Sequence, residues 1–192
     1  MEGTVLMGDK SCQVKEKASA SEVLAHFKDR IIGTPRRGSI HGVILREFAR
    51  DCGLADSIEI KNFDWADFLL DALMDGDIDG ACGTPALAVL AKRRGAKIIL
   101  RPDEIWPFNP SHGIIARERL ILASPLILED FLVIHEEACN LLQESPQIAA
   151  RLIHNAMRII DEDFAREVVA ISPKYCASLL DELMHRWLSC QC

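Results

Sequence analysis

The sequence has no run of hydrophobic residues long enough to cross a membrane. A transmembrane helix needs about 20 consecutive apolar residues, and no stretch of the chain approaches that length. The N-terminal residues also lack the basic start and the sustained apolar core of a secretory signal. As written, the sequence predicts a soluble, cytoplasmic protein. If the true start lies upstream, the prediction becomes a periplasmic or extracellular one.

An excess of positive charge is lacking as well. The chain has 22 Lys and Arg against 29 Asp and Glu, which gives a formal net charge of −7. Proteins that wrap nucleic acid neutralise phosphates with clustered Lys and Arg, so this balance argues against a nucleic-acid partner. Basic residues gather locally at Arg36-Arg37 and at residues 92–94, and we interpret the second group as a solvated helix end.

Paired cysteines are also scarce. The chain has seven cysteines, an odd number, and five of them stand alone in mostly apolar surroundings. This spacing is typical of reduced thiols in a core and not of a disulfide framework. The one close pair, Cys190 and Cys192, has no second pair or histidine near it, so it is weak evidence for zinc. We therefore expect neither a metal nor a cofactor.

What the chain does contain is an alternation of short apolar runs with longer amphipathic segments between Arg30 and Arg117. This pattern predicts strands over residues 30–33, 57–62, 78–82 and 97–100. It predicts helices over residues 39–52, 66–74 and 84–95. Strands that alternate with helices favour a mostly parallel sheet covered on both faces, so the predicted fold class is α/β.

The pattern changes to helices after Arg117. Helical periodicity covers residues 126–144, 145–160, 161–169 and 173–189. Ser-Pro pairs at residues 124–125, 145–146 and 172–173 predict N-caps, each followed by a proline in the first helical position. Before Arg30, residues 4–7 predict a strand and residues 21–27 a short helix.

Candidate binding residues follow from a rule of open α/β sheets, in which ligands bind beyond the carboxyl ends of the strands. The turns after the four strands carry Thr34, Gly38, Ser39 and His41, then Asn62, then Cys82, Gly83 and Thr84, then Asn109 and His112. Ser39 and Thr84 are natural N-caps, and a helix start with open backbone N–H groups is a ready anion site. These groups suit a small anionic or polar solute.

Catalysis is less well supported by these turns. They hold no pair of carboxylates, which excludes acid and base chemistry of the glycosidase type. Cys82 with His41 or His112 would form a nucleophile and base, but a single cysteine at a strand end is more often a packing residue. The same three residues could ligate a metal, although nothing in their spacing demands it.

Three segments of the chain resemble the type II periplasmic solute-binding proteins. They are Ile32-Gly-Thr-Pro-Arg-Arg-Gly-Ser39, Asp75-Gly-Asp-Ile-Asp-Gly-Ala-Cys-Gly-Thr-Pro85 and Ile105-Trp-Pro-Phe-Asn-Pro-Ser-His-Gly-Ile-Ile-Ala-Arg117. The branch they resemble most serves ABC importers for nitrate, sulfonates and thiamine precursors. The resemblance implies a ligand-binding α/β lobe over residues 30–117 and a mainly helical remnant of the other lobe over residues 1–29 and 118–192. It also implies ABC transporter membrane components as partners.

The front of the chain departs from this family, whose members have about a lobe of sequence before the segment that resembles Arg30. The helices after Arg117 would normally pack on the sheet of that lobe. Their apolar residues exceed what one helix can hide on one stripe: Leu126, Ile127, Phe131, Leu132, Ile134, Leu141 and Leu142. Such patches mark interfaces, so we expect a homodimer or a separate chain that supplies the missing lobe.

The resemblance also brings an enzyme alternative, because thiamine-pyrimidine synthases and menaquinone-pathway dehydratases share the fold. The synthases carry a short cysteine-rich run that this chain lacks. A lysine for a pyridoxal phosphate aldimine would be expected near the site, and Lys61 and Lys97 are the nearest. The resemblance thus favours a binding protein over an enzyme.

Overall fold

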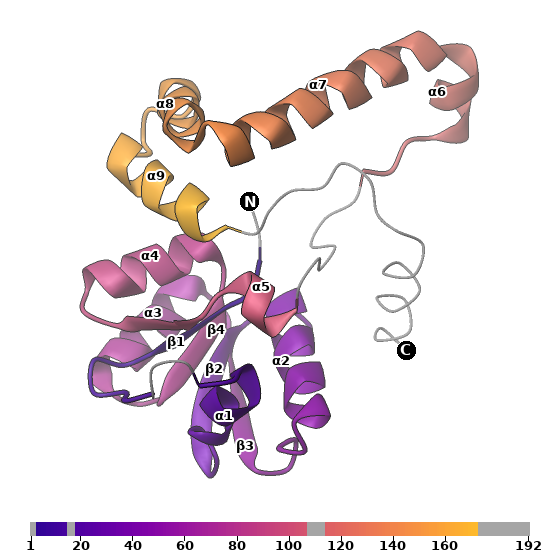
Figure 1. The fold of residues 1–192 in the computed structure, drawn as a ribbon. Coiled ribbons are helices and arrows are strands. Elements are labelled where there is room, and N and C mark those ends of the chain that lie inside the picture. Colours follow the sequence, from indigo (N-terminus) through magenta and orange to yellow (C-terminus); the bar gives the residue numbers. More distant parts are fainter. Residues whose placement is uncertain (1–2, 15–17, 107–113, 173–192) are drawn as a thin grey trace. The chain divides into compact units, whose positions relative to one another are not determined.

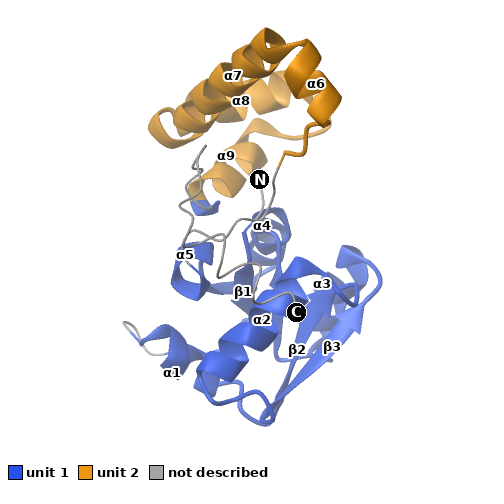
Figure 2. Cartoon of the chain, turned by 90° about the vertical axis from the view of Figure 1, so that its right-hand side faces the viewer, with its two compact units in different colours: residues 1–107, 171–173, 191 blue, residues 108–170, 174–190, 192 orange. Residues whose placement is uncertain are grey.

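The computed structural model describes residues 3–14, 18–106 and 114–172 (Figure 1). These residues divide into two units, coloured separately in Figure 2. Unit 1 contains the described residues up to Trp106 together with Ile171 and Ser172, and it is an α/β unit. Unit 2 contains the described residues from Ile114 to Ala170, and it is helical.

The sheet of unit 1 has five strands. They are β1 (Val5–Gly8), β2 (Arg30–Pro35), β3 (Ile58–Phe63), β4 (Gly80–Gly83) and β5 (Lys97–Leu100). Their order is β3-β2-β4-β1-β5. β2 is parallel to β3 and β4, whereas β1 is antiparallel to both β4 and β5. Four described strands thus run in one direction, which confirms the predicted mostly parallel α/β fold.

β1 lies in the α/β sheet, whereas its residues were predicted to belong to the remnant of the other lobe. It lies between β4 and β5, with Val5 opposite Gly83 and Leu6 opposite Leu100. Val5, Leu6 and Met7 are fully buried because both faces and both edges of β1 are covered. The α/β unit therefore begins before Arg30, and residues 3–14 and 18–29 lie in it and not in the helical region.

Helices cover both faces of this sheet (Figure 1). They are α1 (Ala20–Ala25), α2 (Ile40–Asp51), α3 (Ala66–Asp75), α4 (Pro85–Arg93) and the short α5 (Pro102–Ile105). Alternate residues of the strands belong to two hydrophobic clusters. The first joins Val5 and Met7 to α3 and α4. The second joins Leu6 and Ile32 to α1 and α2.

Unit 2 consists of α6 (Glu118–Ala123), α7 (Pro125–Glu144), α8 (Pro146–Ala156) and most of α9 (Glu162–Ile171). α5 and α6 were not predicted, α8 ends earlier than expected, and the helix expected over residues 173–189 lies outside the described residues. Pro125 and Pro146 begin helices as expected, but Ser124 and Ser145 form no side-chain cap hydrogen bond. None of the described helices combines the length and the apolar character that a membrane crossing requires.

Candidate functional site

Two helices of unit 1 begin at the same edge of the sheet. β2 and β4 are parallel neighbours, with Ile32 opposite Gly80 and Gly33 opposite Ala81. α2 follows β2 and α4 follows β4, so both helix N-termini lie beyond the carboxyl ends of these strands. We call this region the carboxyl edge and define it by the predicted residues Thr34, Gly38, Ser39, His41, Asn62, Cys82, Gly83 and Thr84.

The turn from β2 into α2 is held by hydrogen bonds of Ser39. Its hydroxyl donates to the carbonyl oxygen of Pro35 at 2.7 Å and accepts the N–H of Gly42 at 3.3 Å. Gly38 has a φ of +81°, a conformation that glycine adopts readily and other residues avoid. The N–H of Ile40 has no partner among the described residues, so it stays open at the start of α2.

In the turn from β4 into α4, a threonine is the N-cap of the helix. The hydroxyl of Thr84 accepts the N–H of Leu87 at 3.2 Å, and Pro85 occupies the first turn, where no intrahelical donor is needed. The N–H of Ala86 has no partner in the described part of the chain. Two open helix starts thus lie at one edge, and each carries a positive partial charge.

Four polar side chains form two hydrogen-bonded pairs at the carboxyl edge. The Thr34 hydroxyl donates to Oδ1 of Asn62 at 3.2 Å, and the Thr4 hydroxyl lies 3.0 Å from Nδ1 of His41. Thr4, Thr34 and His41 are buried, whereas Asn62 is exposed. A Cβ on Gly42 would lie 3.3 Å from the Thr34 hydroxyl, so the first turn of α2 packs directly on Thr34.

Thr4 is not among the predicted site residues, although the sequence contains a signal for it. Thr4 lies two residues before Leu6, so it faces the same side of the sheet as the second cluster. A polar residue at the end of a fully apolar strand indicates a hydrogen-bonding partner at that edge. Because β1 runs opposite to β4, its first residues, and not its last, lie at the carboxyl edge.

Cys82 and Gly83 form the buried floor of the turn after β4. Burial raises the pKa of the Cys82 thiol to about 12, so the thiol is protonated at neutral pH. A Cβ on Gly83 would lie 2.6 Å from Cδ2 of Leu87, which is too close. Only glycine therefore lets β4 and α4 pack this closely at position 83. Among the described residues, no three His, Cys, Asp or Glu side chains gather closely enough to hold a metal ion.

The two lysines considered for a cofactor each contact another group of the chain. Lys97 begins β5, at the opposite edge of the sheet, and its Nζ donates to the carbonyl oxygen of Cys12 at 2.8 Å. Lys61 Nζ lies 5.3 Å from the centre of the Phe63 ring. Asn109 and His112, the two remaining predicted site residues, lie outside the described residues.

The predicted residues at the carboxyl edge differ in exposure, and this difference separates two roles. Thr34, His41, Cys82 and Gly83 are buried. Gly38 and Asn62 are exposed, and Ser39 and Thr84 are partly exposed. The buried residues hold the strand ends and helix starts together, while the exposed ones are accessible to a solute. Arg36 and Arg37, both exposed, stand just before the start of α2.

The fold of the chain is similar to that of solved structures described as binding components of ABC importers or as sulfonate-binding proteins. The aliphatic sulphonate binding protein SsuA of Escherichia coli aligns with 98% of this chain at 12% identity and a TM-score of 0.77. A zinc-bound ligand-binding component of an ABC-type import system from Staphylococcus aureus aligns with 98% at 14% identity and a TM-score of 0.67. The alkanesulfonate-binding protein SsuA of Xanthomonas axonopodis, bound to MOPS, aligns with 97% at 14% identity and a TM-score of 0.65.

The chain spans about three fifths of the length of these proteins, since it covers 58%, 62% and 62% of them in that order. No protein-family profile matches the sequence, and no curated protein matches it either. At these low identities the likeness defines the fold alone. All three neighbours are described as binding components, not as enzymes.

Proposed function

We propose that the chain is a solute-binding module, related to ABC transporter substrate-binding proteins, that binds a small anionic or polar ligand at the carboxyl edge. The observation that carries this proposal is the pair of capped helix starts, α2 and α4, at neighbouring strand ends. Open backbone N–H groups and the helix dipoles favour an anion there. The exposed Arg36 and Arg37 add positive charge beside the start of α2.

Within this class we propose a sulfonate as the first candidate ligand, ahead of nitrate or a thiamine precursor. Two of the neighbours are described as sulfonate-binding proteins, which supports this order. A sulfonate offers three acceptor oxygens to the N–H groups of Ile40 and Ala86 and to the amide of Asn62. The predicted site residues, including Asn109 and His112, remain part of this proposal.

A melting-temperature screen tests the proposed function. A ligand that binds only the folded state at 100 times its Kd adds about 2.7 kcal/mol to the free energy of unfolding. We expect methanesulfonate or MOPS to raise the Tm of the purified chain by several degrees over sodium chloride at equal ionic strength. If sulfonates, nitrate and a pyrimidine all leave the Tm at the chloride value, the proposal is wrong.

Binding is better supported than an enzymatic role of the same fold. A thiol whose pKa is raised to about 12 by burial is a poor nucleophile at neutral pH. The enzyme alternative, a relative of thiamine-pyrimidine synthases or menaquinone-pathway enzymes, therefore has no nucleophile in Cys82. The compartment stays a prediction from the sequence; the Escherichia coli neighbour is described as periplasmic.

We also propose that the helical unit is covered in the assembled protein, by a second copy or by a separate chain that supplies another lobe. Large side chains of α7 are exposed by 63% at Ile127 and 64% at Ile134, and a soluble monomer rarely leaves such a stripe uncovered. Light scattering measures the oligomeric state directly, since the single chain has a mass of 21.4 kDa. Membrane components of an ABC transporter remain further proposed partners.

A further inference from the structure

α6 packs against the beginning of α7 (Figures 1 and 2). Side chains of the two helices line a groove. Its volume is about 480 Å³. Apolar side chains from both helices form much of its lining, with Ile121 from α6 and Leu128, Leu132 and Val133 from α7. All the residues that line the groove belong to unit 2.

The groove is open to solvent although its lining is largely apolar. Ile121, Leu132 and Val133 expose 44%, 53% and 51% of their surface. α7 has 20 residues, yet Cys139 is its one buried residue among those described. Exposed contiguous apolar surface of this kind is typical of sites that bind a protein, a membrane or a ligand.

The charges around the groove have one dominant sign. Residues 118–144 contain six Asp and Glu side chains and one cation, Arg119. Glu129 and Glu136 line the groove, and neither forms an ion pair with any described residue. α7 itself carries no Lys or Arg. The groove is therefore apolar at its base and negative at its rim.

We propose that this groove binds a basic amphipathic helix of a separate polypeptide. Leu or Ile side chains on one face of that helix would enter the groove, as in other helix-in-groove complexes. Its Lys or Arg side chains would pair with Glu129 and Glu136. A second copy of this chain fits less well, because its own α7 would bring carboxylates against carboxylates. This inference does not depend on the proposed solute site.

A labelled model peptide tests the proposal on the full chain. The probe is an 18-residue peptide of Leu and Lys whose Leu residues recur at helical spacing, and the control peptide has Glu in place of Lys. We expect fluorescence anisotropy to detect binding of the Leu/Lys peptide only. Its Kd should rise at least tenfold between 0.05 and 0.3 M sodium chloride, because the carboxylate contacts are screened by salt.

Paired variants separate the groove from general attraction to an acidic protein. Glu129→Lys with Glu136→Lys should weaken binding of the Leu/Lys peptide at least tenfold. Glu137→Lys with Glu144→Lys makes the same charge change on α7 outside the groove lining and should weaken it less than threefold. Circular dichroism checks that both variants keep the helical content of the parent chain.

Three results would overturn the proposal. Equal weakening by both variant pairs would mean that the peptide responds to net charge and not to the groove. Absence of binding at 0.05 M salt would leave the groove without a basic partner. A dimer in light scattering that strengthens with salt and resists the peptide would assign the surface to a second copy, because screening relieves repulsion between two acidic helices.

Discussion

At the scale of single residues, Gly38 and Gly53 offer a matched test of the proposed solute site. Their φ values are +81° and +69°, and a Cβ at either position would meet no atom within 4 Å. Replacement by alanine therefore adds only the backbone penalty of the left-handed region, about 1–2 kcal/mol. Gly38 stands at the start of α2, whereas Gly53 follows the end of that helix.

We expect Gly38→Ala and Gly53→Ala to lower the free energy of unfolding by similar amounts, as urea denaturation will measure. Only Gly38→Ala should weaken the binding of a sulfonate, by about threefold, because it disturbs the helix start whose dipole attracts the anion. Titration of both variants with methanesulfonate checks the difference. Equal affinities in the two variants would remove Gly38 from the site.

The pKa of Cys82 predicts how stability responds to alkaline pH. The thiol of the unfolded chain ionises near its ordinary value of 9.0, whereas burial raises the pKa in the folded chain to about 12. Between these values the unfolded state binds fewer protons, so stability falls as pH rises. The expected loss of stability from this one group is about 1 kcal/mol between pH 9 and pH 10. Denaturation at pH 9 and pH 10 should show a steeper loss in the parent chain than in Cys82→Ala.

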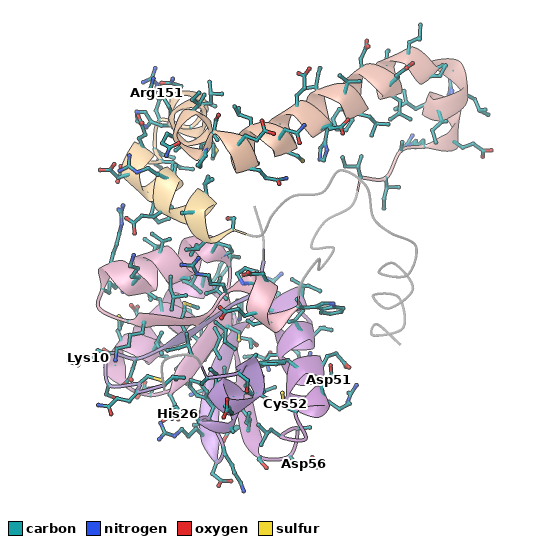
Figure 3. All side chains as sticks on the ribbon, viewed as in Figure 1. Lys10, His26, Asp51, Cys52, Asp56 and Arg151 are labelled. Atoms are coloured by element: carbon teal, nitrogen blue, oxygen red, sulfur yellow. The ribbon has the colours of Figure 1, made fainter. Side chains whose placement is uncertain are left out.

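Burial also predicts the order in which thiols react. Cys52 is partly exposed at the end of α2 (Figure 3), whereas Cys82 is fully buried. We expect iodoacetamide at pH 7.5 to modify Cys52 before Cys82, and mass spectrometry of tryptic peptides will follow both. Rapid and complete labelling of Cys82 would mean an activated thiol and would support the enzyme alternative.

At the scale of elements, serine caps with and without a hydrogen bond should differ in their contribution to stability. The Ser39 hydroxyl bonds both to Gly42 and to Pro35, whereas Ser145 makes no side-chain cap bond at the start of α8. We expect Ser39→Ala to lower the free energy of unfolding by about 1 kcal/mol, as for other N-caps. Ser145→Ala should stay within about 0.5 kcal/mol of the parent chain. Urea titration of both variants measures the contrast, and equal losses would contradict it.

The long elements of unit 1 could be predicted from the sequence because their signals are local. The apolar stripe that begins after Ser39 and the Thr84-Pro85 start placed α2 and α4 within a residue or two. The direction of β1 could not be predicted, because an apolar run does not specify which strands it will join. The end of α8 at Ala156 could not be predicted either, because the helical pattern of the sequence continues to residue 160. The chain turns back beyond Met157, and Nδ1 of His154 lies 2.6 Å from the carbonyl oxygen of Ile160.

The candidate site was predictable only in part. The rule for strand ends selected the turns correctly as neighbours, since β2, β3 and β4 are parallel. It carried no information on exposure, so it treated the buried Thr34 and His41 like the exposed Asn62. Thr4 contacts His41, and that contact depends on the insertion of β1 beside β4. Such long-range pairings are set by tertiary structure and not by local pattern.

At the scale of the whole molecule, the two units differ in how much apolar surface each buries. Both large hydrophobic clusters consist of residues of unit 1, with leucines, isoleucines and Phe27 among them. The helices α6, α7 and α8 bury only small side chains among the described residues, namely Cys139, Ala149 and Ala150. Because burial of apolar area is the main stabilising contribution, we expect unit 2 to open more readily than unit 1.

Hydrogen exchange followed by mass spectrometry measures this difference and links it to both proposed ligands. Amides of β2 and β4 should exchange slowly, near the rate of global unfolding, while those of α6 and α7 should exchange much faster through local opening. Methanesulfonate should slow exchange at the start of α2 and leave α7 unchanged. The Leu/Lys peptide should slow exchange in α6 and α7 and leave α2 unchanged. Equal protection of the two units without ligand would contradict the expected order of stability. The exposed Leu132 and Val133 indicate that α6 and α7 bury too little apolar surface for such protection.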